Sequence, residues 1–150
     1  MKMFKSFLSI IGCFLCLQTA WGTSLRISEQ NEQNTGCDLY SARFESKQSF
    51  LDFYRHLLKA LEEKNVVKLG SLSLYPLNTK LDGKKVQLKD EVEFQKHFKS
   101  FFTNDVIEGA QRQKLSEVFC SPKGVQIGNA GQLWIQIDEN KKIGIRTINP

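Results

Sequence analysis

Apolar residues at helical spacing dominate residues 47–64 of the chain. They recur three and four positions apart and therefore share one face of a helix, while the charged residues at 62–64 fall on the opposite face. Ser46 or Ser49 can supply the side-chain oxygen that caps the first turn. The pattern predicts an amphipathic helix with the buried stripe Phe50, Phe53, Tyr54, Leu57, Leu58 and Leu61.

A hairpin is predicted in the middle of the chain. Residues 66–70 extend the helical pattern by one short turn, and an extended stretch follows. Pro76 has no N–H to donate, so it belongs at a strand start or a sheet edge. The dipeptide Asp82–Gly83 stands between two alternating arms and can adopt the positive φ of a tight hairpin turn.

Two more helices are predicted after the hairpin. Asp90 caps the first of them, and Thr103–Asn104 ends it before a shorter helix over residues 105–112. The buried stripe of the first helix is predicted to be Val92, Phe94, Phe98, Phe101 and Phe102.

The last third of the chain changes from helical spacing to alternation of apolar and polar residues. Alternation is typical of antiparallel strands with one face against a core. Turn residues at 121–124, 128–131 and 138–141 separate the four predicted strands. Helices on one side of a mostly antiparallel sheet make an α+β architecture. The apolar strand residues are Val118 and Phe119, then Val125 and Ile127, then Leu133, Ile135 and Ile137, then Ile143, Ile145 and Ile148.

Residues 1–22 have the composition of a cleaved signal peptide. Lys2 and Lys5 precede an apolar run over residues 7–17, and small residues stand at 20 and 22. We expect export to the bacterial periplasm or the medium and a mature chain that begins at Thr23. The alternative is a lipoprotein acylated on Cys13, although the apolar run continues past that residue.

The rest of the chain divides into a polar N-terminal arm, residues 23–46, and a single domain, residues 47–150. No later stretch reaches the ~20 apolar residues of a membrane-spanning helix, so no span is expected. Loss of Lys2 and Lys5 would lower the net charge from +5 to +3, with lysines and acids interspersed. This mixed surface argues against a nucleic-acid partner.

Cys37 and Cys120 are the two cysteines that follow the predicted leader. An even pair in an exported protein is most simply a disulfide, closing a loop of about 83 residues and stabilising by up to ~4.5 kcal/mol. The competing interpretation is a reactive Cys120 thiol with His97 as its base, but no nucleophile motif accompanies it.

Several segments in succession resemble small exported bacterial proteins with a nuclear-transport-factor-2-like, cystatin-like fold. They are YPL at residues 75–77, the hairpin, EFQKHFKSFF at 93–102, and GVQIGNAGQLWI followed by KIGIRTINP from residue 124 to the end. The resemblance implies a strongly curved sheet around helices, a cone whose open end could hold a small ligand. Because this superfamily contains enzymes, ligand binders and interaction modules, it does not select a function.

Two acid–histidine pairs are the candidates for catalysis. Asp52 precedes His56 by four residues, and Glu93 precedes His97 by four residues, so each carboxylate could orient an imidazole on its own helix. If the two faces met, they could transfer protons or hold a metal. Both pairs lie off the main apolar stripes, and two scattered histidines lack the ligand spacing of zinc motifs. We expect no metal, and no cofactor either, because no glycine-rich phosphate motif opens a helix.

Tyr75 and Trp134 are the candidates for ligand binding, because an aromatic ring offers a stacking face and a polar tip. Trp134 alternates away from its apolar neighbours, so it could also contribute, with Gln136, to a homodimer interface on the exposed sheet face. The sequence thus favours an exported, non-enzymatic binding or interaction module for a protein or small-molecule ligand. The alternative is a small cone-pocket enzyme, an isomerase or hydrolase using Asp, His and Tyr.

Overall fold

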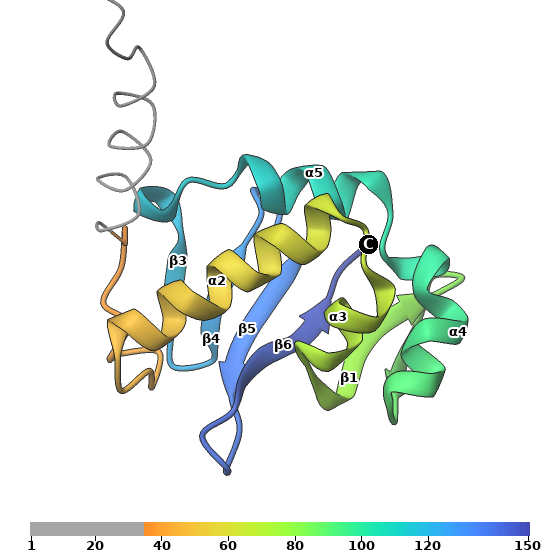
Figure 1. The fold of residues 1–150 in the computed structure, drawn as a ribbon, viewed down its shortest axis with the longest axis horizontal. Helices are drawn as coiled ribbons and strands as arrows, with labels where there is room; N and C mark the ends of the chain where they lie inside the picture. The colour runs from red at the N-terminus through yellow and green to blue at the C-terminus, as the bar shows by residue number, and fades with distance from the viewer. Residues whose placement is uncertain (1–34) are drawn as a thin grey trace, which may run out of the picture.

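The computed structural model describes residues 35–150 (Figure 1). The predicted signal peptide and the first part of the predicted arm lie outside the described residues and stay predictions. The described end of the arm docks on the domain, because Leu39, Ala42 and Phe44 are buried in its core.

The first two helices are α2 (Lys47–Glu62) and α3 (Val66–Ser71). Helix α2 begins where the Ser46 hydroxyl accepts the N–H of Ser49 at 3.3 Å, which confirms the predicted cap. The apolar stripe of α2 is buried as its spacing predicts, except that Leu58 is only half-buried.

The next two helices are α4 (Glu91–Phe101) and α5 (Asn104–Arg112). Asp90 caps α4 through a 2.9 Å bond from the N–H of Glu93, as predicted. The prediction that Val92 belongs to the buried stripe is wrong, since its side chain is 75% exposed. It lies two positions before Phe94, and at 3.6 residues per turn that spacing places it on the opposite side of the helix. In the described part of the chain, no helix has the length and apolarity needed to cross a membrane.

One six-stranded sheet carries the rest of the domain, in the order β2-β1-β6-β5-β4-β3. Its neighbouring strands are antiparallel except for β1 and β6, which run parallel. The short 3-10 helix Leu115–Glu117 leads into β3. The strand bounds are β1 (Ser73–Leu81), β2 (Lys84–Leu88), β3 (Phe119–Ser121), β4 (Gly124–Ile127), β5 (Leu133–Ile137) and β6 (Ile143–Ile148).

The hairpin of β1 and β2 turns at Asp82 and Gly83, whose φ values of 51° and 75° are those of the predicted tight turn. Pro76 lies inside β1, where the pairing with β6 is irregular between Ser73 and Asn78. A residue without an N–H cannot complete a regular ladder there.

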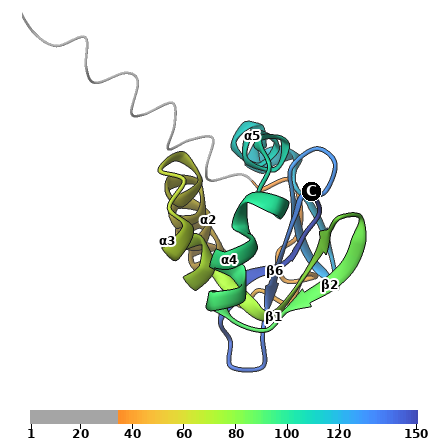
Figure 2. The same cartoon turned by 90° about the vertical axis from the view of Figure 1, so that its right-hand side faces the viewer.

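The helices cover one face of the sheet, and the core lies between the two layers (Figure 2). Phe50, Phe94 and Phe101 from the helices and Ile135 from the sheet are among its fully buried side chains. This arrangement confirms the predicted α+β class. The sheet is open, with β2 and β3 at its edges, so the cone implied by the family resemblance stays a prediction.

Candidate functional site

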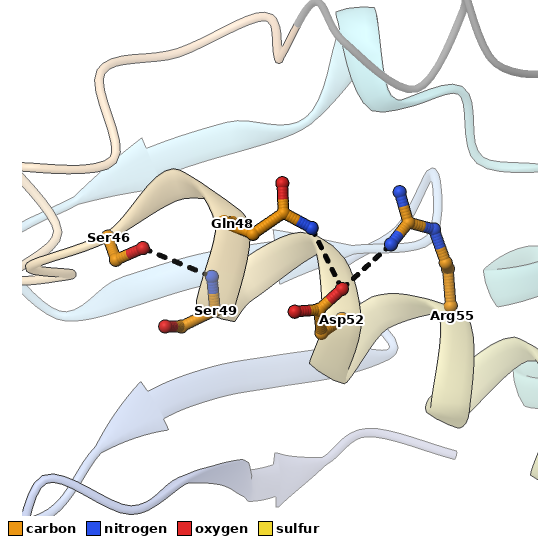
Figure 3. A network of polar contacts seen from close by, with 5 residues as sticks. All are labelled: Ser46, Gln48, Ser49, Asp52 and Arg55. Carbon is orange, nitrogen blue, oxygen red and sulfur yellow. Dashed lines mark hydrogen bonds and ion pairs between the residues drawn. The ribbon is translucent and has the colours of Figure 1, made fainter.

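Asp52, the acid of the first predicted pair, is held by neighbours other than His56. Its Oδ1 accepts a hydrogen bond from Gln48 Nε2 at 2.9 Å and pairs with Arg55 Nη1 at 2.7 Å (Figure 3). A guanidinium carries a full charge and two or more donors, so it competes well for a carboxylate on an exposed helix face. His56 is exposed on the same helix.

Glu93, the acid of the second pair, belongs to the start of α4. Its Oε2 accepts the N–H of Lys89 at 2.8 Å, while its own N–H donates to Asp90. This arrangement is similar to a capping box, except that the Glu93 side chain reaches the N–H of the residue before the cap, and it stabilises the first turn of the helix. The Glu93 carboxylate therefore has a structural role at the start of α4. Its position three residues after Asp90 lets the side chain reach back to the backbone before the helix.

The side chains of the two histidines have no polar partner in the described part of the chain. Among residues 35–150, neither His56 nor His97 has a side-chain hydrogen bond or an ion pair, with its predicted acid or with the other histidine. Within the same range, no group of three or more His, Cys, Asp and Glu side chains could hold a metal ion.

Tyr75 lies half-buried on β1, beneath α3. Its hydroxyl donates to the carbonyl of Gly70 at 3.1 Å. Burial raises the pKa of Tyr75 well above its ordinary value, and the nearby Glu91 carboxylate raises it further. The raised pKa keeps the phenol protonated at physiological pH.

Trp134 lies half-buried on the face of the sheet that carries no helix, which we call the open face. Its neighbours Leu133 and Ile135 point into the core, as the alternation predicts. The register places Trp134 between Gln126 on β4 and Thr147 on β6. Gln136 lies on the same strand and donates its Nε2 to the carbonyl of Lys123 at 2.7 Å.

Trp134 is part of a row that crosses the whole open face. Paired residues of neighbouring strands share a face, so the register alone defines the row. Its members run from β3 to β2 as Phe119, Gln126, Trp134, Thr147, Asn78 and Gln87.

A cleft of about 620 Å³ lies at the β2 end of this row, and we call it the hairpin cleft. Its volume is within the range of small-molecule sites, about 300–1,000 Å³. The hairpin contributes three successive cross-strand pairs, and two further residues come from β6 and from the segment directly after it. The lining consists of Asn78, Thr79, Lys80, Lys85, Val86, Gln87, Thr147 and Asn149.

Strand alternation divides these residues between the two faces. The pair Thr79–Val86 lies between two pairs of the open face, so its side chains point toward the helices. Thr79 is 4% exposed, and Val86 packs against the core. Because these two side chains point away from the open face, the pair borders the cleft through its backbone, which we call the floor, and we call the open-face side chains of the lining its walls.

The cleft is positively charged. Lys80 stands directly opposite Lys85 across the hairpin. Neither lysine has an ion pair with a described residue. Strands β1, β2 and β6 contain no acidic residue, while Arg146 on β6 adds a positive charge outside the cleft lining.

The cysteine pair lies at the other end of the sheet. Cys37 in the arm and Cys120 on β3 are at disulfide distance, with their Cα atoms 5.6 Å apart. This agrees with the predicted bridge and leaves no free Cys120 thiol for His97 to activate.

Comparison with known protein families, curated proteins and solved structures finds no match to this chain. The nuclear-transport-factor-2-like relationship therefore stays a prediction, and no functional residue is transferred from a relative.

The residues of the hairpin cleft were not among those singled out from the sequence. The predicted turn at Asp82–Gly83 could have located the hairpin part of the cleft. A two-residue loop fixes the strand register and therefore the pairs Lys80–Lys85 and Asn78–Gln87. The contribution of Thr147 had no such signal, since it depends on β6 lying beside β1.

Proposed function

We propose that this protein is an exported binding module without enzymatic chemistry, and that it holds a small molecule in the hairpin cleft. The observation that carries the proposal is the cleft itself, a hollow of about 620 Å³ whose lining includes several residues with polar or charged side chains. Polar groups that converge on a concave surface of this size are typical of ligand sites.

The state of the residues that were candidates for catalysis also favours a binding function over an enzymatic one. The carboxylates of Asp52 and Glu93 are engaged in helix surface and capping contacts, and the Tyr75 phenol is held in its neutral form. None of these three residues lines the hairpin cleft.

Export is supported by two independent features. The leader sequence at residues 1–22 has the charge and apolar pattern of a signal peptide. The Cys37–Cys120 pair is of a kind that persists in oxidising compartments.

The binding function is tested by two-dimensional amide NMR of the purified protein with a mixture of small fragments of different charge. We expect shift changes at the cleft floor and walls, residues 78–80 and 85–87. Changes centred on His56 or His97 instead would favour the enzyme alternative. The proposal would be contradicted if no fragment in the mixture caused localised shift changes.

A pair of variants separates cleft binding from general effects on the sheet. Thr147→Trp fills the cleft and should abolish the shift changes, whereas Gln136→Trp places the same ring on the open face outside the cleft and should preserve them. Equal loss in both variants would locate the binding elsewhere.

A further inference from the structure

We infer that the ligand of the hairpin cleft is a small organic oxyanion, a carboxylate or phosphate group held between Lys80 and Lys85. This inference rests on the proposed function, because it names the class of ligand for the same cleft.

The first argument is the placement of two like charges opposite each other. Residues directly opposite on antiparallel strands have Cβ atoms about 4.5–5.5 Å apart, and like charges there repel. Lys80 and Lys85 are such a pair. An anion between the two ammonium groups replaces this repulsion by two attractions.

The second argument is that neither lysine is neutralised by a carboxylate. Lys59, Lys114 and Lys141 each pair with a glutamate within 4.0 Å. Lys80 and Lys85 have no such partner among the described residues, and the only acid within the hairpin, Asp82, occupies the exposed turn. The two ammonium groups therefore remain available to a ligand.

The third argument is the surrounding charge. Arg146 on β6 donates Nη1 to the carbonyl of Pro76 at 3.3 Å, which holds its guanidinium close to β1. No acid on β1, β2 or β6 offsets this charge. The local potential therefore favours anions over cations and neutral molecules.

The fourth argument concerns the neutral groups of the cleft. Asn78 and Gln87 are joined by a 2.9 Å bond from Gln87 Nε2 to Asn78 Oδ1, and the Asn149 amide donates to Gly131 at 2.7 Å. These bonds fix the walls. The hydroxyl of Thr147 has no hydrogen bond with a described residue, so it remains free to donate to a ligand oxygen.

The inference is tested with pairs of probes that share an aromatic ring and differ in charge. The pairs are benzoate with benzamide and phenyl phosphate with phenol, each titrated into the purified full chain at low salt. We expect the anions to shift the amides of residues 78–80 and 85–87 and the neutral partners to bind at least about tenfold more weakly. The benzoate and phenyl phosphate arms distinguish carboxylate from phosphate ligands.

A double variant tests the role of the two lysines. Lys80→Gln with Lys85→Gln should weaken anion binding about tenfold, while Lys96→Gln with Lys99→Gln, the same charge change on α4, should leave it within about twofold. Equal weakening in both double variants would overturn the inference, because it would report net charge alone. The probe pairs need no variant, so the test holds even if a double variant fails to fold.

The outcomes for the wild-type chain separate the two proposals. Binding of benzamide and phenol in the cleft as tightly as their anionic partners would overturn the anion inference and leave the binding function standing. Binding of no probe in the cleft, together with a negative fragment screen, would overturn both.

Discussion

Two residues of β1 carry hydroxyl groups with different hydrogen bonding, the half-buried Tyr75 and the buried Thr79. Tyr75 donates a hydrogen bond to the carbonyl of Gly70, whereas the buried Oγ1 of Thr79 has no hydrogen-bond partner among residues 35–150. A buried polar atom without a partner costs free energy that an apolar atom of the same shape does not. The two residues therefore predict opposite responses to removal of the hydroxyl.

Thr79→Val should raise the free energy of unfolding by about 1 kcal/mol, because valine keeps the shape and the strand preference and removes the unsatisfied oxygen. Thr103→Val is the matched control. Its hydroxyl accepts the N–H of Val106 and caps α5, so its loss should lower the free energy of unfolding by about 1 kcal/mol. Urea unfolding measures both, and a destabilised Thr79→Val variant would contradict this interpretation of β1.

Tyr75→Phe should alter how stability depends on alkaline pH. The folded-state pKa of Tyr75 is raised, so above pH ~10 the unfolded chain loses this proton while the folded chain keeps it, and stability falls. From pH 7 to 9 the free energy of unfolding of the wild type should exceed that of the variant by about 1 kcal/mol. This difference should shrink above pH 10. Urea unfolding across this range checks it, and a difference that stays constant to pH 11 would count against the burial of the phenol.

Secondary-structure elements were largely predictable where a local signal exists. Ser46 and Asp90 begin α2 and α4 because a short polar side chain satisfies free N–H groups at a helix start. Asp82–Gly83 sets the hairpin because few other dipeptides accept positive φ at both positions. Val92 is exposed although it is apolar, because it lies on the side of α4 opposite the buried stripe. Apolar character alone does not predict burial on a helix.

The bridge between the arm and β3 is an element-scale feature with a measurable energy. Replacing both Cys37 and Cys120 by serine should lower the free energy of unfolding by up to about 4.5 kcal/mol, since an 83-residue loop is no longer closed in the unfolded chain. The unreduced protein should also gain the mass of two hydrogens on reduction. An unchanged mass and an unchanged unfolding midpoint would show that the bridge does not form.

At the scale of the whole molecule, the sequence could not indicate where the last strand goes. β6 lies between β1 and β5, so a parallel pair joins residues about seventy positions apart, and no local pattern encodes that pairing. The hairpin cleft exists because of this placement, since Thr147 and Asn149 complete its lining. Tyr75 and Trp134, predicted as ligand contacts from their chemistry alone, lie outside it.

Assembly is a second question at this scale. The open face carries Trp134 and the largely exposed Phe119 in one row, which keeps the predicted homodimer through this face a testable idea. Light scattering coupled to size-exclusion chromatography should give a dimer that Trp134→Ala weakens. A monomer at high protein concentration would exclude it.

The central claim is that the hairpin cleft binds a small anion between its two opposed lysines. A crystal structure of the protein grown with benzoate tests it most directly. The account predicts the benzoate carboxylate within hydrogen-bond distance of the Nζ atoms of Lys80 and Lys85. An empty cleft at saturating benzoate, or benzoate bound only at another site, would contradict it.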